Sequence, residues 1–258
     1  MSLTQIQLTA DHSTDFRIVT GVMMFKQNRM IRLAISERLL LPFGGANATW
    51  SHGGYVFYEE EMRSWKMNQS EFKIDDVGVE EGADYHTLTF DNRGINLDTV
   101  IVPEGHVVTG VRFRVFKGRL QLEVRATQFD FHAGVLKYIG DSVWVANPKG
   151  GKNKIHLNNP LDSTKHPKRA APNRTPDAYV EFGPSGNWAD MGQTTVPFID
   201  TQKVEPYSPV PLSGVGIYYR GHPGDGGFIA PKLVLYDYES KLVKLNRGKY
   251  VYINENPQ

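Results

Sequence analysis

The chain contains no cysteine, which excludes disulfide bonds, thiolate metal sites and cysteine nucleophiles. It also has almost no net charge, because 29 basic and 28 acidic side chains leave a balance of +1. A general affinity for nucleic acid is therefore not expected. No apolar run approaches the roughly 20 residues of a membrane span, so we expect no such span. What remains is a chain of 258 residues, 40% hydrophobic and 11% aromatic, which is the composition of a globular protein with a real core.

Sequence signatures of catalysis are missing as well. The eight histidines are scattered, and none forms an H-x-H or H-x-x-x-H pair, so no local metal signature exists. There is no nucleophile elbow, P-loop or dinucleotide fingerprint. Adjacent acids at 59–61, 75–76 and 80–81 could serve glycoside hydrolysis, but such clusters are more typical of solvated turns. We therefore predict a protein that is not an enzyme and that has no cofactor and no bound metal.

The clearest structural signal lies at 104–130. From Val107 to Phe116 the residues alternate between two faces, and a second alternating run follows from Leu120 to Val124. Lys117 and Gly118 separate the two runs. Period-two alternation around a two-residue connection predicts a β-hairpin, in which the glycine supplies the positive φ that the turn requires.

This hairpin pattern occurs three times. The strand that contains Thr109-Gly110-Val111 aligns with one around Gly21 and with one around Gly214, and each is followed by a second apolar strand. The three glycines stand 89 and 104 positions apart. A glycine inside a strand pattern indicates a bulge or a close approach of another backbone. We predict hairpins at 17–35, 107–125 and 212–236 that superpose by rotation about a common axis.

Residues 59–67 could form a short helical turn or an edge strand, and helical periodicity is otherwise absent. Shorter strand candidates fill the intervals between the copies. The sequence therefore predicts one all-β domain over residues 1–258, built from three related units at about 15–60, 95–145 and 178–245. A β-prism-like arrangement would bury the apolar face of each unit against the other two. A closed β-sandwich is the alternative.

A basic insertion interrupts the repeats at 146–176. It has five prolines, seven lysines and arginines and few apolar residues, so it buries little surface. We expect a flexible surface excursion with little regular structure, tied down where Ile155 and Leu157 find apolar partners. The insertion is either a solvated loop or a basic arm for an anionic partner such as a sulfated glycan, acidic lipid headgroups or nucleic acid.

Several motifs resemble an uncharacterised family of insect proteins, known only as a domain of unknown function. They are VPEGHVVTGVRFR at 102–114, QTTVPFID at 193–200, PLSGVGI at 211–217 and GGFIAPKL at 226–233. The resemblance extends from about Phe16 to Asp237. It implies an arthropod or arthropod-associated origin, such as an insect virus, and no activity. Members of that family carry a further N-terminal region, so this chain could be a trimmed domain or a standalone relative.

Two glycine-rich loops are the candidate ligand sites. The turn of the third hairpin combines a carboxylate, an imidazole and open backbone N–H groups with aromatic rings, a set that can hold sugars. A similar loop leaves the first unit. The candidate residues are Tyr219, His222, Asp225, Gly226 and Phe228 in the first of these loops and Asn47, Trp50 and His52 in the second. A glycine-rich turn without a ligand is the simpler interpretation of both.

Two functions fit this pattern. The first is a non-enzymatic extracellular recognition module for glycans or anionic polysaccharides, which needs no nucleic-acid partner. The second is a structural or self-assembling protein of an insect matrix or of an insect-virus-associated particle. Three glycosylation sequons, at Asn47, Asn68 and Asn173, favour secretion. The first residues, however, lack the apolar centre of a signal peptide.

Overall fold

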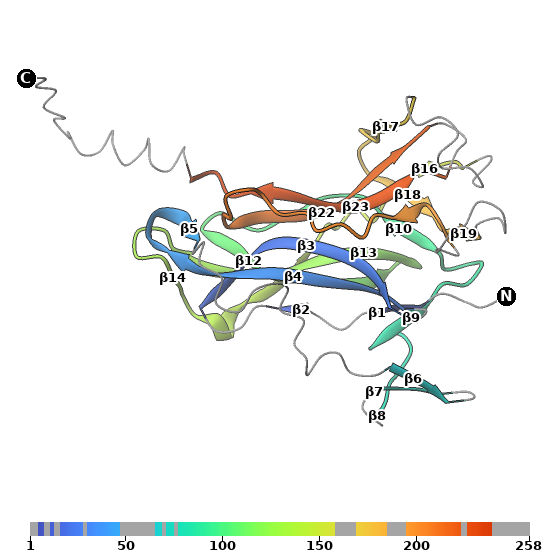
Figure 1. The fold of residues 1–258 in the computed structure, drawn as a ribbon, viewed down its shortest axis with the longest axis horizontal. Helices are drawn as coiled ribbons and strands as arrows, with labels where there is room; N and C mark the ends of the chain where they lie inside the picture. Colours follow the sequence, from blue (N-terminus) through green and yellow to red (C-terminus); the bar gives the residue numbers. More distant parts are fainter. Residues whose placement is uncertain are drawn as a thin grey trace, which may run out of the picture.

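The computed structural model describes residues 5–7, 11–12, 16–27, 30–46, 65–68, 71–74, 77–157, 169–184, 195–222 and 226–238. Within these ranges the regular structure consists of strands and of two single-turn 3-10 helices, η1 (Pro42–Gly44) and η2 (Ile139–Asp141). The prediction of an all-β protein is therefore confirmed. The strands form three larger sheets and two small ones (Figure 1).

The first large sheet has the order β3 (Arg17–Gln27), β4 (Met30–Leu41), β1 (Gln5–Gln7) and β9 (Tyr85–Thr87), with β5 (Gly45–Ala46) beside β4. The second has the order β16 (Asn153–Ile155), β18 (Ala178–Glu181), β10 (Gly94–Asn96), β13 (Arg119–Asp130), β12 (His106–Phe116) and β2 (Asp11–His12), with β14 (Val135–Leu136) and β15 (Val143–Ala146) beside β13. The third has the order β11 (Val100–Ile101), β22 (Leu212–Gly221), β23 (Phe228–Leu235) and β21 (Phe198–Ile199), with β17 (Ala171–Pro172) beside β22. The small sheets are β6 (Trp65–Asn68), β7 (Glu71–Ile74) and β8 (Val77–Gly78), and β19 (Gly183–Pro184) with β20 (Thr195–Val196).

Each large sheet contains one long antiparallel hairpin: β3–β4, β12–β13 or β22–β23. These are the three hairpins that the sequence predicts, so the presence of a hairpin at each of these places is confirmed. The turn of the second hairpin has φ of 52° at Lys117 and 74° at Gly118. Two consecutive residues of positive φ match the right-handed twist of the flanking strands. The lysine shares the left-handed conformation that the sequence indicated only for the glycine.

A β-bulge interrupts each hairpin at the glycine that marks its repeat. The register shifts between Val19 and Gly21 in the first, between Val108 and Gly110 in the second, and between Leu212 and Gly214 in the third. One extra residue, a threonine or a serine, precedes the glycine each time. The strand glycines therefore mark bulges, as predicted.

The hydroxyl of the extra residue faces the same carbonyl oxygen in all three hairpins. It lies within 3.4 Å of the carbonyl oxygen of the residue that pairs with the glycine on the opposite strand, although Thr20 and Ser213 each have a closer acceptor, Glu205 Oε1 (2.9 Å) and the carbonyl of Leu235 (3.0 Å). These contacts join Thr20 to Ser36 (3.4 Å), Thr109 to Arg125 (3.4 Å) and Ser213 to Val234 (3.3 Å). A short hydroxyl side chain can bond to nearby backbone in this way, which explains why the position holds threonine or serine.

A short crossing segment pairs with the outer edge of each hairpin just after its bulge. Asp11 pairs with Val111, Val100 pairs with Val215, and Val204 pairs with Val22, all antiparallel. Each segment precedes one hairpin in the sequence but pairs with the following hairpin, and the segment that precedes the third hairpin pairs with the first. The spacing is constant: Asp11, Val100 and Val204 each lie eleven residues before the valine of their own hairpin. The three crossing segments therefore link the three hairpins in a closed cycle.

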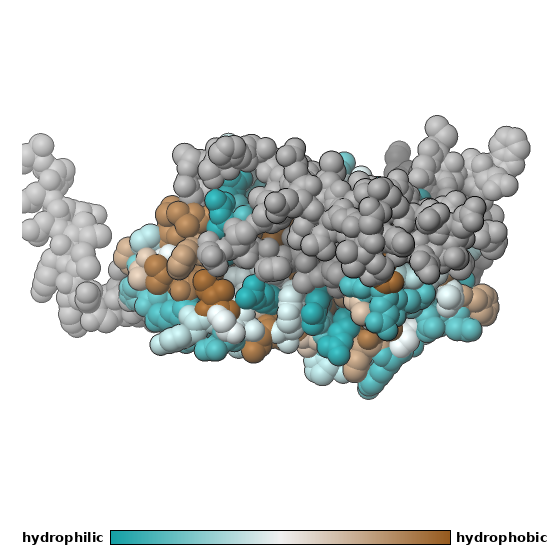
Figure 2. Space-filling model, turned by 90° about the horizontal axis from the view of Figure 1, so that it is seen from below, coloured by the Kyte–Doolittle hydropathy of each residue, from teal (hydrophilic) through white to brown (hydrophobic). Residues whose placement is uncertain are grey.

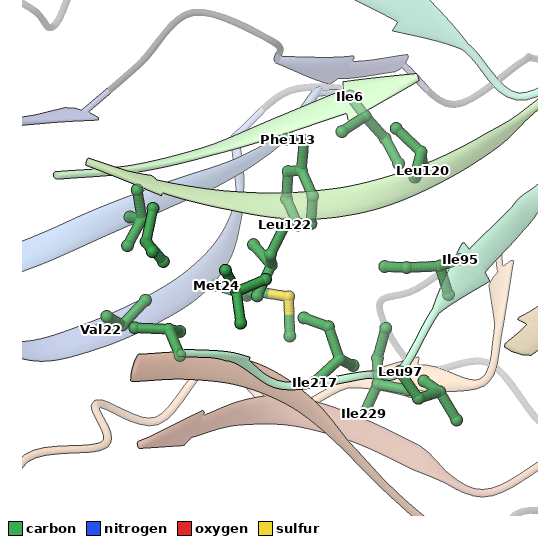
Figure 3. Packing of buried hydrophobic residues seen from close by; sticks show 14 of the residues in the cluster. Ile6, Val22, Met24, Ile95, Leu97, Phe113, Leu120, Leu122, Ile217 and Ile229 are labelled. Atoms are coloured by element: carbon green, nitrogen blue, oxygen red, sulfur yellow. The ribbon is translucent and has the colours of Figure 1, made fainter. Parts of the chain in front are cut away.

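The main hydrophobic core draws on all three hairpins. Met24, Phe113 and Ile217 are each at most 3% exposed, and they approach one another in the centre of the molecule (Figure 3). A second cluster, built from Ile18, Leu40, Val107, Phe129, Leu136 and Tyr236, again combines residues of each hairpin or its flank. The hairpins thus share their buried faces.

The described parts of the basic insertion lie at 146–157 and 169–176. They contain the two short strands β16 and β17, which lie at the opposite end of the molecule from β5 and β14 (Figure 1). Ile155 and Leu157 are partly buried and pack against the main core. The expected apolar anchors of the insertion are therefore confirmed.

Candidate functional site

The sequence nominated five residues at the turn of the third hairpin, and the structure describes four of them. Phe228 is 40% exposed, and its ring centroid lies 5.9 Å from that of Phe198. His222 is half-buried and Gly226 is buried. Tyr219 is only 6% exposed and belongs to the main core, so the aromatic surface that a ligand could reach at this turn is provided by Phe228 and Phe198.

The other nominated residues fall outside the described parts of the chain. Asp225 belongs to the turn itself, and Asn47, Trp50 and His52 belong to the loop that leaves the first hairpin. Their roles stay predictions.

The outer edge of β22 is only partly covered. At one end β11 pairs with Gly214 and Val215, and at the other end β17 pairs with Arg220 and Gly221. The N–H of Asn173 extends the second contact by donating to the carbonyl of Tyr219 (2.8 Å). Between these two short strands, no described strand pairs with the outer edge at 216–218.

A polar cleft of about 340 Å³ opens beside this gap in the edge. One wall is the segment between β10 and β11, and the other is the segment that follows β17. The floor comes from β22 and β23. The lining residues are Leu97, Asp98, Thr99, Pro172, Asn173, Arg174, Thr175, Pro176, Ile217, Tyr218, Tyr219 and Lys232.

Asp98 is the most unusual group in the cleft. Its Oδ1 accepts the backbone N–H of Asp177 (3.0 Å), while its buried Oδ2 has no hydrogen-bond partner among the described residues. Burial raises the pKa of Asp98 above its usual value and the charge of Asp177 adds to this, whereas the hydrogen bond from the Asp177 N–H and the charge of Lys149 lower it. A buried carboxylate oxygen without a donor is costly, so a donor from the cleft or the carboxyl proton itself would stabilise it.

Asp177 holds the wall around Asp98 in place. Its backbone has a φ of 56°, its carboxylate accepts the N–H of Gly151 (3.1 Å), and its carbonyl accepts the N–H groups of Lys152 (2.7 Å) and Asn153 (2.8 Å). The basic insertion is therefore fastened directly behind the cleft.

Asp98, Asn173, Tyr218 and Lys232 were not nominated as site residues from the sequence. In the sequence Asn173 stands out only as a sequon, and nothing local links it or Tyr218 to Asp98. The available signal was the pair of glycines Gly214 and Gly216. A Cβ at Gly216 would lie 2.7 Å from Thr99 Oγ1, so the second glycine marks where the Asp98 segment crosses β22.

The described part of the chain holds no group of three or more histidines, aspartates and glutamates placed to bind a metal ion. Nor does it hold a helix long and apolar enough to cross a membrane. Comparison of the chain with protein-family models and with curated proteins finds no match.

Proposed function

We propose that this protein is a non-enzymatic extracellular recognition module that binds saccharides in the cleft beside β22. The observation that carries the proposal is the half-buried Asp98, whose Oδ2 has no described donor, in the lining of a polar cleft that also presents Asn173 and Tyr218. The sequons and the resemblance to the insect family support secretion and an arthropod-associated origin, which we propose as well.

Saccharides match the chemistry of this cleft. Their hydroxyl groups donate to carboxylates and amides, and their C–H faces pack on aromatic rings. About 340 Å³ lies at the lower end of the usual range for small-molecule sites, which is roughly 300–1,000 Å³. The cleft therefore suits a short part of a longer glycan.

The variant Asp98→Asn tests this proposal. Asparagine keeps one oxygen for the N–H of Asp177 but replaces the other acceptor by an NH2 group. We expect glycans that bind the wild type to bind the variant about 10- to 100-fold more weakly, since a hydrogen bond to a charged group contributes about 1.5–3 kcal/mol. A glycan array identifies the ligand, and calorimetric titration measures both affinities.

The loss of glycan affinity in Asp98→Asn should not be accompanied by a loss of folding stability. Because the pKa of Asp98 is higher in the folded state than in the unfolded state, ionisation of Asp98 destabilises the fold. This loss of stability develops as the pH rises from the ordinary aspartate pKa through the raised pKa of the folded state. At pH 7 the asparagine variant should thus be at least as stable as the wild type. The matched control is Asp141→Asn, which removes an exposed carboxylate of η2 outside the cleft. Equal affinity of Asp98→Asn and the wild type would contradict the proposal.

The same titration includes Asp225→Ala in the turn of the third hairpin. If this variant lost binding while Asp98→Asn kept it, the saccharide site would lie at the turn with Phe228, His222 and Gly226. Tyr219 would then stay a core residue, because its ring has little exposed surface.

We also propose that the three hairpins are related by a pseudo-threefold axis in a β-prism-like arrangement, with a β-sandwich as the alternative. The three equivalent bulges support this arrangement, and so do the equivalent positions of their hydroxyl groups and the cyclic exchange of crossing segments. One repeated unit would then have diverged so that the third hairpin carries the cleft.

The second candidate function is that of a structural or self-assembling protein. Hydrophobic side chains gather on the surface at the end of the molecule where β5 and β14 lie (Figure 2). The large exposed residues of β4, η1, β14 and the loop after β14 include Leu39, Leu41, Phe43, Val135 and Tyr138. Exposed apolar patches mark many association surfaces. A size measurement across a range of protein concentrations distinguishes this candidate from a monomeric glycan binder.

A further inference from the structure

We infer that the saccharide bound in this cleft is an anionic one, whose carboxylate or sulfate group is held by Lys232 and Arg174 at the rim. This inference rests on the proposed saccharide-binding function. It adds the chemical class of the ligand.

Lys232 and Arg174 are both exposed, and both line the cleft with Asp98. Neither makes an ion pair with any acid in the part of the chain that the structure describes. Other cations at the surface do have acidic partners, for example Lys154 with Glu181 (2.7 Å) and Lys137 with Asp130 (3.0 Å). The rim of the cleft therefore offers two cations for an external anion.

The pairing of β22 with β23 places Lys232 beside an aromatic ring. Gly216 pairs with Lys232, and two residues along the strand Tyr218 pairs with Ala230. Residues that pair across an antiparallel ribbon, and those two positions away, share one face. On this face Thr99 lies over Gly216, and Thr99, Tyr218 and Lys232 all line the cleft. A sugar ring that carries an acidic group would contact a hydroxyl, an aromatic ring and an ammonium group there.

The negative and positive charges of the cleft lie at different depths. Asp98 is half-buried, with its Oδ2 fully buried, and the two cations lie exposed. A small inorganic anion would be repelled by the carboxylate if it entered deeply, and a neutral sugar would leave both cations unused. A saccharide with hydroxyl groups at one end and an acidic group at the other is complementary to both regions.

The test compares three tetrasaccharides by calorimetric titration: hyaluronan, which carries uronates, chondroitin sulfate, which carries uronates and sulfates, and neutral chitin. Inorganic sulfate and a single-stranded oligonucleotide are added as simple polyanion probes. We expect at least one acidic tetrasaccharide to bind about tenfold or more tightly than the neutral one, with an affinity that falls as salt is raised. Either acidic tetrasaccharide supports the inference, and the stronger of the two tells uronate from sulfate.

Three variants complete the test. Lys232→Gln and Arg174→Gln should each weaken binding of the acidic tetrasaccharide about tenfold and leave the neutral one unchanged. Lys137→Gln removes the same charge far from the cleft lining and should change neither affinity. Equal binding of acidic and neutral tetrasaccharides, with no effect of Lys232→Gln, would overturn the inference and leave the proposed function standing. Absence of binding by every glycan on the array would overturn both. Binding of inorganic sulfate or of the oligonucleotide as tight as that of the acidic tetrasaccharide would overturn the saccharide class.

Discussion

Replacing Gly214 by alanine is expected to destabilise the protein by about 3 kcal/mol, in the upper part of the range for overpacked sites. A Cβ at this position would overlap the carbonyl oxygen of Val100 and lie 2.7 Å from a side-chain carbon of Ile101. The atoms in its way include backbone, so β11 would have to move away from β22. Urea unfolding of the wild type and the variant measures the loss.

Two further glycines provide the comparison. At Gly21 the nearest atoms to an added Cβ are the Cβ of Glu205 at 2.9 Å and the carbonyl oxygen of Val204 at 3.0 Å, so Gly21→Ala should cost less, about 1–2 kcal/mol. At Gly140 nothing lies within 4 Å, and Gly140→Ala should have almost no effect. Equal stability of all three variants would mean that the crossing segments do not press on the bulge glycines.

Replacing Glu123 by alanine is expected to have a similarly large effect, about 3–5 kcal/mol. The carboxylate is 4% exposed and accepts bonds from Arg112 (2.7 Å) and Arg114 (3.1 Å). The guanidinium of Arg112 also lies 4.1 Å from the ring centre of Trp144. Removing the carboxylate leaves this arginine without its counter-charge, and thermal and urea unfolding should both record the loss.

Arg114→Ala is the matched control. The side chain of Arg114 is 61% exposed, so its ion pair with Glu123 is screened by solvent and should contribute about 1 kcal/mol or less. If Arg114→Ala destabilised the protein as much as Glu123→Ala, exposure would not govern the strength of this charge network.

The hairpins could be predicted because their signals are local. The alternation around Lys117-Gly118 and the recurrence of a hydroxyl residue before Gly21, Gly110 and Gly214 are visible within about 25 residues. Each repeat carries its own turn and its own bulge, and the bulge hydroxyl faces the opposite strand of the same ribbon. Such patterns need no knowledge of the rest of the fold.

The crossing segments could not be predicted, since each consists of about two residues and pairs with a hairpin about 100 positions away in two of the three cases. Nothing in the residues Val100-Ile101 distinguishes them from other β-branched pairs. Only the glycine on the receiving strand signals the contact, and it does not identify the partner. For the same reason the cleft was missed: Asp98, Asn173 and Lys232 come together only when β11 and β17 dock on β22.

The position of the cleft follows from this architecture. In the third hairpin β11 covers one end of the β22 edge and β17, from the basic insertion, covers the other. The insertion thus forms one wall of the site and, through Asp177, helps to position Asp98. Of its basic side chains, Arg174 lines the cleft.

The most direct test of the account is a crystal structure of the protein grown with a saturating concentration of the tightest-binding tetrasaccharide. The account predicts sugar density in the cleft beside β22, with a hydroxyl within hydrogen-bond distance of Asp98 and the acidic group nearest Lys232 or Arg174. Density at the turn near Phe198 and Phe228 with an empty cleft, or no bound sugar anywhere in such crystals, would contradict it.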